Sequence, residues 1–406
     1  MIPTSVKSAA RPALLNLLLV ALLGALLRYK IAFYFPALDQ KHLLYAHYHF
    51  AFLGWLTHAL YTGFYTAAAP FLPPHRQKLF RVLIGVNLFS AVGMLGSFII
   101  WGYGMAAILF LLLATGVSIA YTIAFFSNAR LVPDAALPRR WAGAALCLHV
   151  LSAAGPLVLA WFVLKGGIDQ KVYLASVYYY LHFQYNGWFF FGVMALALPL
   201  LRSYGVDIRG EHSLFRTLSL TILPAFLLSL LWAQLPAWLY ALVVTAALAQ
   251  LAGWTVFLLR LISATRILRS NNAPVPAIFF YTAVLAITIK FVLQAISVIP
   301  DLSHLVFGLR PVVIGYLHLV FLGAYTVFFI GYYFATGSLS HSRLTNRAAL
   351  GFWAGVVLNE LCLAVQGFAA FAYIFIPFIN ETLFAVACLL LLSAGMLLVS
   401  QYQPRQ

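Results

Sequence analysis

The chain alternates long apolar runs with short polar segments. The runs are continuously apolar, whereas a strand of a membrane β-barrel would alternate apolar and polar residues with a period of two. A transmembrane helix needs about 20 consecutive, mostly apolar residues. The pattern therefore predicts an all-α polytopic membrane protein with twelve transmembrane helices, near residues 12–35, 42–69, 79–103, 105–127, 140–164, 174–201, 215–237, 239–263, 275–298, 311–336, 346–373 and 380–401.

The composition narrows the class of protein further. Of the 406 residues, 64% are hydrophobic and only 8% are charged, against about 25% charged residues in soluble domains. This balance excludes an ordinary soluble globule and a disordered chain. The longest hydrophilic stretch, near 202–214, is too short to fold by itself, and no long internal repeat is evident. We therefore expect residues 1–406 to form one transmembrane domain in a lipid bilayer.

The excess of positive charge predicts an orientation. The formal net charge is +16, which on a soluble protein would indicate a nucleic-acid or anionic-surface binder. Here 17 of the 24 Lys and Arg residues fall at the termini and in the loops after even-numbered helices, while six fall in the other loops. Because cytoplasmic loops carry the excess of cations, we expect both termini in the cytoplasm of a bacterial inner membrane. The charge then gives no reason to expect a nucleic-acid partner.

This orientation gives each histidine in the predicted helices a depth. His47 and His49 in the second helix, His182 in the sixth and His318 in the tenth lie five to eight residues from the outer ends of these helices. At 1.5 Å per residue, the four rings share a layer about 8–12 Å below the outer surface. A single buried histidine is usually a packed side chain, but a shared level on three helices favours a metal or haem site, since neutral imidazole ligates both.

The spacing within the second helix separates its two histidines. Residues two apart on an α-helix point about 200° apart, so His47 and His49 face different neighbours and do not ligate the same iron. Either one is the ligand while the other packs, or the two belong to adjacent sites. The sequence leaves this choice open.

Three further ionisable residues have candidate roles, because charges within a membrane are expensive. Lys290 lies near the histidine level in the ninth helix and, with Arg310, is a candidate partner for haem propionates. Snorkelling of Lys290 to the outer interface is an equal alternative. Glu360, near the middle of the eleventh helix, is the carboxylate deepest in the predicted membrane and a candidate for a proton path.

The segments around the histidines resemble a known family. They read AHYHFAFLGW, YYYLHFQYNGWFFF and GYLHLVFLG. With twelve helices and outer-level histidines on helices 2, 6 and 10, the chain resembles subunit I of the haem–copper oxidase superfamily, which includes cytochrome c oxidases and nitric oxide reductases. It is also similar to NnrS-type membrane proteins linked to nitric oxide stress. The resemblance implies a low-spin haem, of b type, between His47 or His49 and His318, and copper or iron at a second site on His182.

Two departures limit what the resemblance implies. The family's seventh helix supplies two adjacent histidines to the non-haem metal, whereas residues 215–237 contain none, and Tyr316 stands where the family's active-site haem ligand would be. The resemblance therefore implies respiratory electron transfer or oxygen or nitric oxide chemistry with an incomplete binuclear ligand set. The partners it implies are cytochrome c, quinol or other respiratory subunits. Two alternatives remain, a proton-coupled transporter and a non-catalytic assembly subunit.

Overall fold

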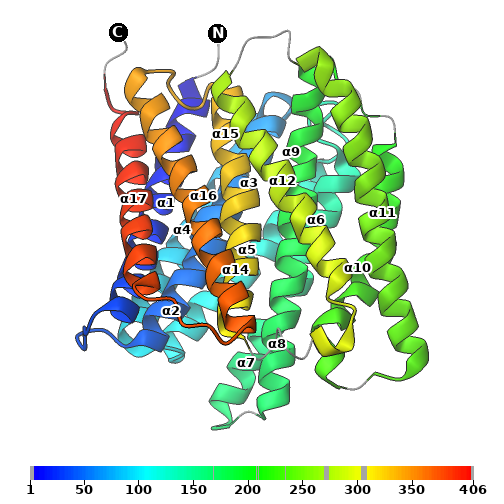
Figure 1. The fold of residues 1–406 in the computed structure, drawn as a ribbon. Helices are drawn as coiled ribbons and strands as arrows, with labels where there is room; N and C mark the ends of the chain where they lie inside the picture. The colour runs from blue at the N-terminus through cyan, green and yellow to red at the C-terminus, as the bar shows by residue number, and fades with distance from the viewer. Residues whose placement is uncertain are drawn as a thin grey trace.

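The computed structural model describes residues 4–167, 169–206, 208, 210–233, 235–268, 274–302 and 309–403. Of the cations counted in the sequence, Arg209, Arg269 and Arg405 lie outside these residues. All the regular structure in the described part is helical (Figure 1).

The first half of the chain forms helices α1 (Thr4–Ala32), α2 (Gln40–Phe50), η1 (Ala51–Thr57), α3 (His58–Ala68), η2 (Ala69–Phe71), α4 (Pro74–Trp101), α5 (Met105–Asn128), α6 (Arg139–Ser152), α7 (Ala154–Leu164), α8 (Gln170–His182), η3 (Phe183–Phe189) and α9 (Phe190–Ser203). The second half forms α10 (Glu211–Phe226), η4 (Leu227–Ala233), α11 (Ala237–Leu268), α12 (Pro274–Ile296), α14 (Arg310–His318), η5 (Leu319–Thr326), α15 (Val327–Ala335), α16 (Arg343–Phe371) and α17 (Ile379–Val399). The segments η1, η3 and η5 are π-helical turns inside longer helices.

Eleven helical segments of the described chain are long and apolar enough to cross a membrane. They match eleven of the twelve predicted runs; for example, the run predicted at 105–127 is the helix Met105–Asn128. The remaining run, 42–69, is the continuous helix from α2 through η1 to α3, which has the length of a span but is not among the eleven. The polar side chains of this helix face the interior, since Thr57, His58 and Thr62 are buried.

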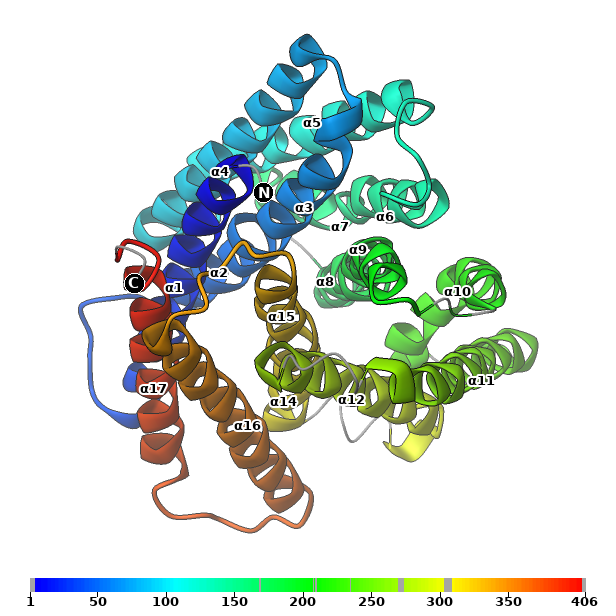
Figure 2. The same cartoon turned by 90° about the horizontal axis from the view of Figure 1, so that it is seen from above.

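The helices pack side by side, with both termini at the same end of the bundle (Figure 1). Seen along the bundle, the helices built from α2–α3, α8–α9 and α14–α15 lie toward the middle (Figure 2). Two indole–hydroxyl hydrogen bonds of 2.9 Å join them: Trp55 donates to Thr326, and Trp188 donates to Thr57. Hydrogen bonds between helices are favourable where no water competes for the donors and acceptors, so these bonds stabilise the inner helices against each other.

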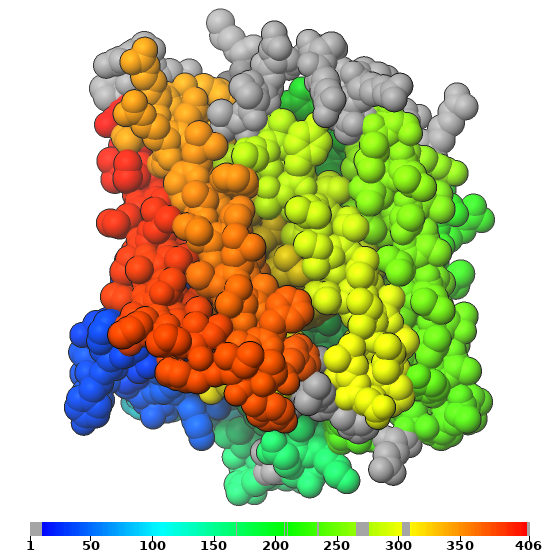
Figure 3. Space-filling model, in the orientation of Figure 1, coloured from blue at the N-terminus to red at the C-terminus, as the bar shows by residue number. Residues whose placement is uncertain are grey.

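The outer surface of the bundle is apolar. On the face shown in Figure 3, α11, α12, α16 and α17 lie beside one another. Their exposed side chains include Leu259, Leu285, Phe368 and Leu392, each at least 60% exposed. An exposed apolar surface of this extent is unfavourable in water but matches a hydrocarbon environment. The protein is therefore an integral membrane protein with an all-α fold.

Candidate functional site

A short repeat marks the three inner helices. The segments His47–Trp55, Tyr180–Trp188 and Tyr316–Ala324 each carry a histidine at their third position and a glycine five residues later. The third-position histidines are His49, His182 and His318, separated by 133 and 136 residues. No other position is identical in all three copies, although most positions match in two of them. Copies this short and this far apart do not stand out as a repeat among other apolar segments.

Each copy of the repeat also has the same backbone feature. A π-helical turn begins within two residues after each of the three histidines. Such turns are rare and frequently occur at functional sites. At Gly54 and Gly187, a Cβ atom would lie 2.6 Å from the Phe50 ring and 2.8 Å from Leu148, so these glycines permit the close packing around the turns. The three histidines thus occupy equivalent positions on equivalent helices.

His49 faces away from the middle of the bundle, toward α4. Its Nε2 atom is 2.9 Å from the hydroxyl of Tyr103, and its ring stacks on Phe98 with centroids 4.7 Å apart. Burial raises the pKa of Tyr103, which lies in the turn between α4 and α5, so the phenol stays neutral. With only 2% of its surface exposed, His49 is a packed histidine with one ring nitrogen hydrogen-bonded.

His47 faces the opposite way, toward α1 and α14. Its Cε1 atom lies 3.3 Å from the position that a Cβ of Gly24 would take, so its ring packs directly against the α1 backbone. Its Nδ1 atom is buried and has no hydrogen-bond partner. A buried polar atom without a partner is costly, but Nδ1 of His49 and Nδ1 of His58 are in the same state, so this feature is consistent with a ligand role for His47 without distinguishing it from the other two.

Among the other histidines, His318 of α14 is the one that interacts electrostatically with His47. A charge on His318 acts directly on His47, and the charge of Arg28 acts on both, so the three side chains form one electrostatic cluster. His318 Nδ1 donates to the carbonyl oxygen of Ile314 at 2.9 Å, which leaves Nε2 as the unprotonated nitrogen. A carbonyl partner on the far nitrogen is the arrangement that orients metal-ligating histidines.

The helix that carries His318 is loosely surrounded. No residue of α14 is fully buried, although α14 lies between α12 and α16 in the bundle (Figure 2). His47 and His318 are both half-buried, whereas His49 and His182 are sealed at 2% exposure. The two histidines that share one electrostatic cluster are therefore also the two that are partly exposed.

His182 has both ring nitrogens engaged. Nε2 donates to the carbonyl oxygen of Ile222 at 2.8 Å, and Nδ1 accepts from the amide of Asn186 at 3.1 Å. At the predicted metal site, both ring nitrogens of His182 are thus engaged in hydrogen bonds within the chain.

Lys290 is buried rather than snorkelled. Only 1% of it is exposed, and its Nζ donates to Gln294 at 2.7 Å and lies 3.9 Å above the ring of Phe291. Gln294 donates to Gln250 at 2.6 Å, which extends the polar chain from α12 to α11. Lys290 therefore belongs to a buried polar chain that joins α12 to α11.

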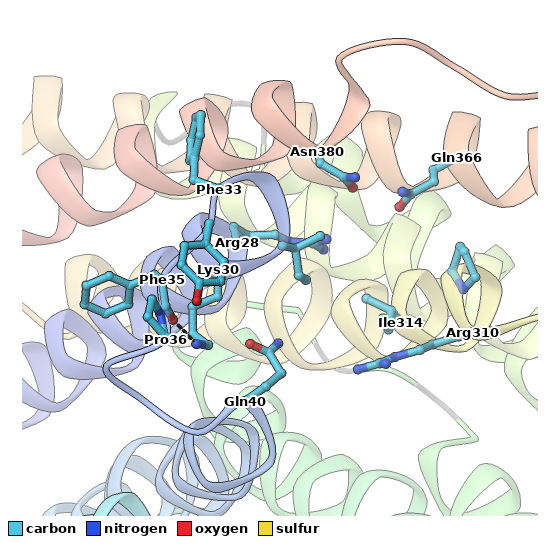
Figure 4. Close-up of a pocket in the computed structure, with 13 residues that line it drawn as sticks. Arg28, Lys30, Phe33, Phe35, Pro36, Gln40, Arg310, Ile314, Gln366 and Asn380 are labelled. Atoms are coloured by element: carbon cyan, nitrogen blue, oxygen red, sulfur yellow. Dashed lines mark hydrogen bonds between the residues drawn. The ribbon is translucent and has the colours of Figure 1, made fainter.

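A cationic pocket lies one turn from His318, at the end of the bundle opposite the termini. It has a volume of about 540 Å³ and is lined by Arg28, Lys30, Ile31, Phe33, Tyr34, Phe35, Pro36, Gln40, Arg310, Pro311, Ile314, Gln366 and Asn380. Arg28, Arg310, Gln366 and Asn380 surround one space in Figure 4. Lys30 donates to the carbonyl oxygen of Phe35. With three cations and no carboxylate in its lining, the pocket suits an anionic group.

Glu360 borders the same region. Its Cγ atom lies 3.9 Å from the position of a Cβ on Gly323, in the π-helical turn after His318, and its Oε1 accepts from Asn359 at 3.1 Å. The charge of Arg28 acts on Glu360 as well as on the two histidines. Arg28 thus links Glu360 to the His47–His318 cluster.

Glu211 is a buried carboxylate that the sequence interpretation missed. It lies at the start of α10 and is 5% exposed. Arg140 donates to it at 3.0 Å, Trp141 at 2.7 Å and His212 at 2.8 Å. The sequence signal was weak because Glu211 falls in the hydrophilic stretch near 202–214, and its partners on α6 are about 70 residues away. The cluster holds α6 and α10 together at the terminal end of the bundle.

Among the described residues, no group of three or more His, Cys, Asp or Glu side chains comes together in a way that holds a metal ion. A haem iron does not need such a group, because the protein supplies only its axial ligands. No known family model and no curated protein matches the chain. The geometry around His47 and His318 is therefore the basis for a functional assignment.

Proposed function

We propose that this membrane protein binds one haem between His47 and His318 and transfers electrons through it. The observation that supports this most is the cluster of these two histidines with Arg28. His47 has a buried ring nitrogen without a partner, and His318 donates its Nδ1 proton to the carbonyl oxygen of Ile314, which leaves Nε2 as the unprotonated nitrogen. Two imidazoles from different helices are a common axial pair for a low-spin b-type haem.

The surroundings support the same proposal. A porphyrin needs flat space between its two axial ligands. No residue of α14, the helix that carries His318, is fully buried, so α14 is not tightly enclosed by its neighbours. Gly24 lets α1 approach the His47 ring. The pocket next to His318 supplies Arg28 and Arg310 for the propionates, since guanidinium groups bind carboxylates with two parallel hydrogen bonds.

Each part of the chain has a separate task in this proposal. When bound, haem supplies one-electron redox chemistry. His47 and His318 fix its position, Ile314 fixes the tautomer of His318, and Arg28 with Arg310 compensates the propionate charge. The apolar helices around the cluster exclude water.

The proposed function does not include a second, non-haem metal ion. In the resembled family the non-haem metal has a ligand at the position of His182, but His182 donates to Ile222 and accepts from Asn186 here. We therefore propose haem-based electron transfer as a member of the haem–copper oxidase subunit I-like proteins, without the oxygen-reducing centre.

The membrane arrangement belongs to the same proposal. We assign the helix α2–η1–α3 as a twelfth span, and its course between the two ends of the bundle, like that of its neighbours, supports this assignment (Figure 1). Its polar composition is explained by its interior position and by His47. The distribution of cations supports a cytoplasmic position for both termini, and in this orientation the cationic pocket lies near the outer surface of a bacterial inner membrane.

The test is an absorption spectrum of the full-length protein, purified in detergent from cells supplied with haem, before and after dithionite. We expect a Soret band and the sharp reduced bands of a six-coordinate low-spin haem, with one haem per chain by pyridine extraction. A protein that carries no Soret band under these conditions would exclude the proposal. Elemental analysis of the same sample distinguishes one iron from iron plus copper.

A further inference from the structure

A second cavity lies between α9, α11, α12 and the helix η5–α15. It has a volume of about 570 Å³ and is lined by Phe190, Val193, Met194, Ala197, Leu200, Leu201, Tyr204, Trp254, Phe257, Leu258, Leu261, Ile262, Pro276, Ala277, Phe280, Tyr281, Ala283, Val284, Ile287, Ala324, Tyr325 and Phe328. None of these described residues is charged, and their only side-chain nitrogen and oxygen atoms belong to three tyrosines and one tryptophan. The cavity is therefore an apolar space within the membrane-spanning part of the bundle.

The cavity is elongated parallel to the helices. On α9 the lining extends from Phe190 to Leu201 and on α12 from Pro276 to Ile287, residues eleven positions apart in each case. At 1.5 Å per residue, each stretch is about 17 Å long. Helix α12 begins at the end of the bundle that carries the termini, and Ile287 lies near the middle of this helix (Figure 1). The cavity thus extends over about one leaflet, since the hydrocarbon core of about 30 Å consists of two.

The polar groups at the deep end of the cavity, near the middle of the bundle, have partners within the chain. Trp254 Nε1 donates to the hydroxyl of Thr288 at 3.0 Å, and the hydroxyl of Tyr325 donates to the carbonyl oxygen of Tyr185. A buried water needs two to four polar partners, so the deep end does not favour water. An apolar group is favoured there instead, because it makes dispersion contacts with the lining.

Aromatic rings border the deep end. The ring centroids of Phe190, Trp254 and Phe291 are 5.6, 5.7 and 6.0 Å from one another. The Lys290 ammonium lies 3.9 Å from the centroid of the Phe291 ring, and neither Lys290 nor Phe291 is part of the described lining. An occupant of the cavity therefore meets rings at this end and no charged group.

The cavity is continuous with the lipid-facing surface of α11 and α12. Two of its lining residues, Ile262 of α11 and Tyr281 of α12, are 56% and 52% exposed. Each lies one helical turn from an exposed leucine on the outer surface, Leu259 and Leu285 respectively. The two helices are neighbours on the face shown in Figure 3. A hydrocarbon chain from the bilayer therefore reaches the cavity sideways, between these two helices.

We propose that this cavity binds one acyl chain of a membrane phospholipid. The lining is apolar, the length matches one leaflet, and the opening faces the bilayer. The headgroup of the lipid lies at the end of the bundle that carries the termini, where Tyr204 lines the cavity, because tyrosines are enriched at the membrane–water interface. The bound chain fills the space between α9 and the pair α11–α12, so the lipid is a structural part of this wall of the bundle.

The first experiment measures the phospholipid that the full-length protein retains after extensive washing in a mild detergent, by mass spectrometry of the intact complex and of its organic extract. We expect one phospholipid per chain in the unmodified protein. Ala283→Phe, which places a ring in the cavity from α12, should lose most of it. Ala252→Phe adds the same ring on the exposed side of α11 and is the matched control, which should retain the lipid.

The second experiment locates the chain within the molecule. Bromine quenches tryptophan fluorescence on contact, and only 3% of Trp254 is exposed, so a chain outside the cavity does not reach this indole. The washed protein is titrated with phosphatidylethanolamine whose acyl chains carry bromine. We expect a larger loss of fluorescence in the unmodified protein than in Trp254→Phe, and this difference should disappear when Ala283→Phe is also present.

The outcomes are independent of the haem proposal, because none of them requires a Soret band. Equal retention of phospholipid in Ala283→Phe and Ala252→Phe overturns the lipid site, and so does an isoprenoid quinone or detergent alone in place of the phospholipid. If Ala283→Phe does not fold, Ala197→Phe fills the cavity from the opposite wall on α9. Equal quenching by the brominated lipid in the unmodified protein and in Trp254→Phe also overturns the proposal.

Discussion

His49 Nε2 lies 2.9 Å from the hydroxyl of Tyr103, and this contact directs the His49 ring toward α4. The ring of His47, two residues earlier, therefore points to the other side, toward Gly24 of α1. The sequence alone did not distinguish the roles of His47 and His49, whereas the different neighbours of the two rings do. Tyr103 comes from the turn after α4, so the division depends on the tertiary fold and not on α2 alone.

The two histidines should respond differently to substitution. We expect His47→Ala to abolish the six-coordinate low-spin spectrum, because the haem iron loses one axial ligand. His49→Ala should keep the spectrum and lower stability by about 1–3 kcal/mol, since it removes the buried hydrogen bond between His49 and the Tyr103 hydroxyl. Absorption spectra of both reduced proteins, with unfolding in detergent as the second measurement, test this. A normal spectrum in His47→Ala combined with its loss in His49→Ala would reverse the assignment.

Removal of Arg28 should weaken haem binding. In Arg28→Gln we expect about 10–100-fold weaker retention of haem, from the ~1.5–3 kcal/mol of a hydrogen bond to a charged group. The midpoint potential should also fall, because a cation near the iron favours the reduced state. Lys30→Gln is the control, since the Lys30 ammonium already donates to the Phe35 carbonyl. Equal effects of the two substitutions would show that the pocket acts only through its total charge.

His182 should not be a metal ligand. We expect His182→Ala to retain the haem spectrum and the metal content of the unmodified protein, because Ile222 and Asn186 occupy both ring nitrogens. Stability should decrease, since the Asn186 amide loses its acceptor. Absorption and elemental analysis measure both properties. Loss of a stoichiometric metal in His182→Ala would restore the second metal site that the resemblance implies.

The start of α2 should depend on pH through Asp39. Hydrogen bonds from the backbone N–H of His42 and of Lys41 lower the pKa of the exposed Asp39 carboxylate below its ordinary value of 3.8. A lowered folded-state pKa means that the stabilisation is present above this ordinary value and is lost as the pH falls through the folded-state pKa. We expect the first turn of α2 to exchange its amide hydrogens faster at acidic pH, relative to unstructured peptide controls.

Asp39→Asn provides the control for this prediction. Asparagine is as good an N-cap as aspartate but does not titrate. Amide exchange in the first turn of this variant should follow the intrinsic pH dependence alone. If hydrogen-exchange mass spectrometry gave identical pH profiles for the unmodified protein and the Asp39→Asn variant, the carboxylate charge would have no role.

The sequence predicted the helices well because hydropathy alone determines them in a membrane. The run at 105–127 and the helix Met105–Asn128 differ by one residue. The hydrogen-bond partners of buried side chains were harder to predict than the helices, because they depend on contacts between segments distant in the sequence. Gln294 lies four residues from Lys290 and was accessible from helical spacing, but the next link to Gln250 crosses to α11.

The π-helical turns could not be predicted from hydropathy. An α-helix and a π-helix of the same apolar residues have the same mean hydropathy, and the difference depends on packing. The common signal was the histidine followed by glycine five residues later, as in His49 and Gly54. That signal is too short to detect without knowing that the three helices are equivalent.

Glu211 should contribute to stability through its buried hydrogen bonds. In Glu211→Gln the charge is lost, and the bonds from Arg140, Trp141 and His212 are weakened or broken. We expect the free energy of unfolding to fall by about 1.5–3 kcal/mol, the range for hydrogen bonds to a charged group. Chemical unfolding in mixed micelles, followed by tryptophan fluorescence, measures it. Asp134→Asn is the control, because its ion pair with Arg139 is half exposed on both sides and should contribute less than about 1 kcal/mol. Equal losses in the two proteins would show that burial adds nothing to the Glu211 cluster.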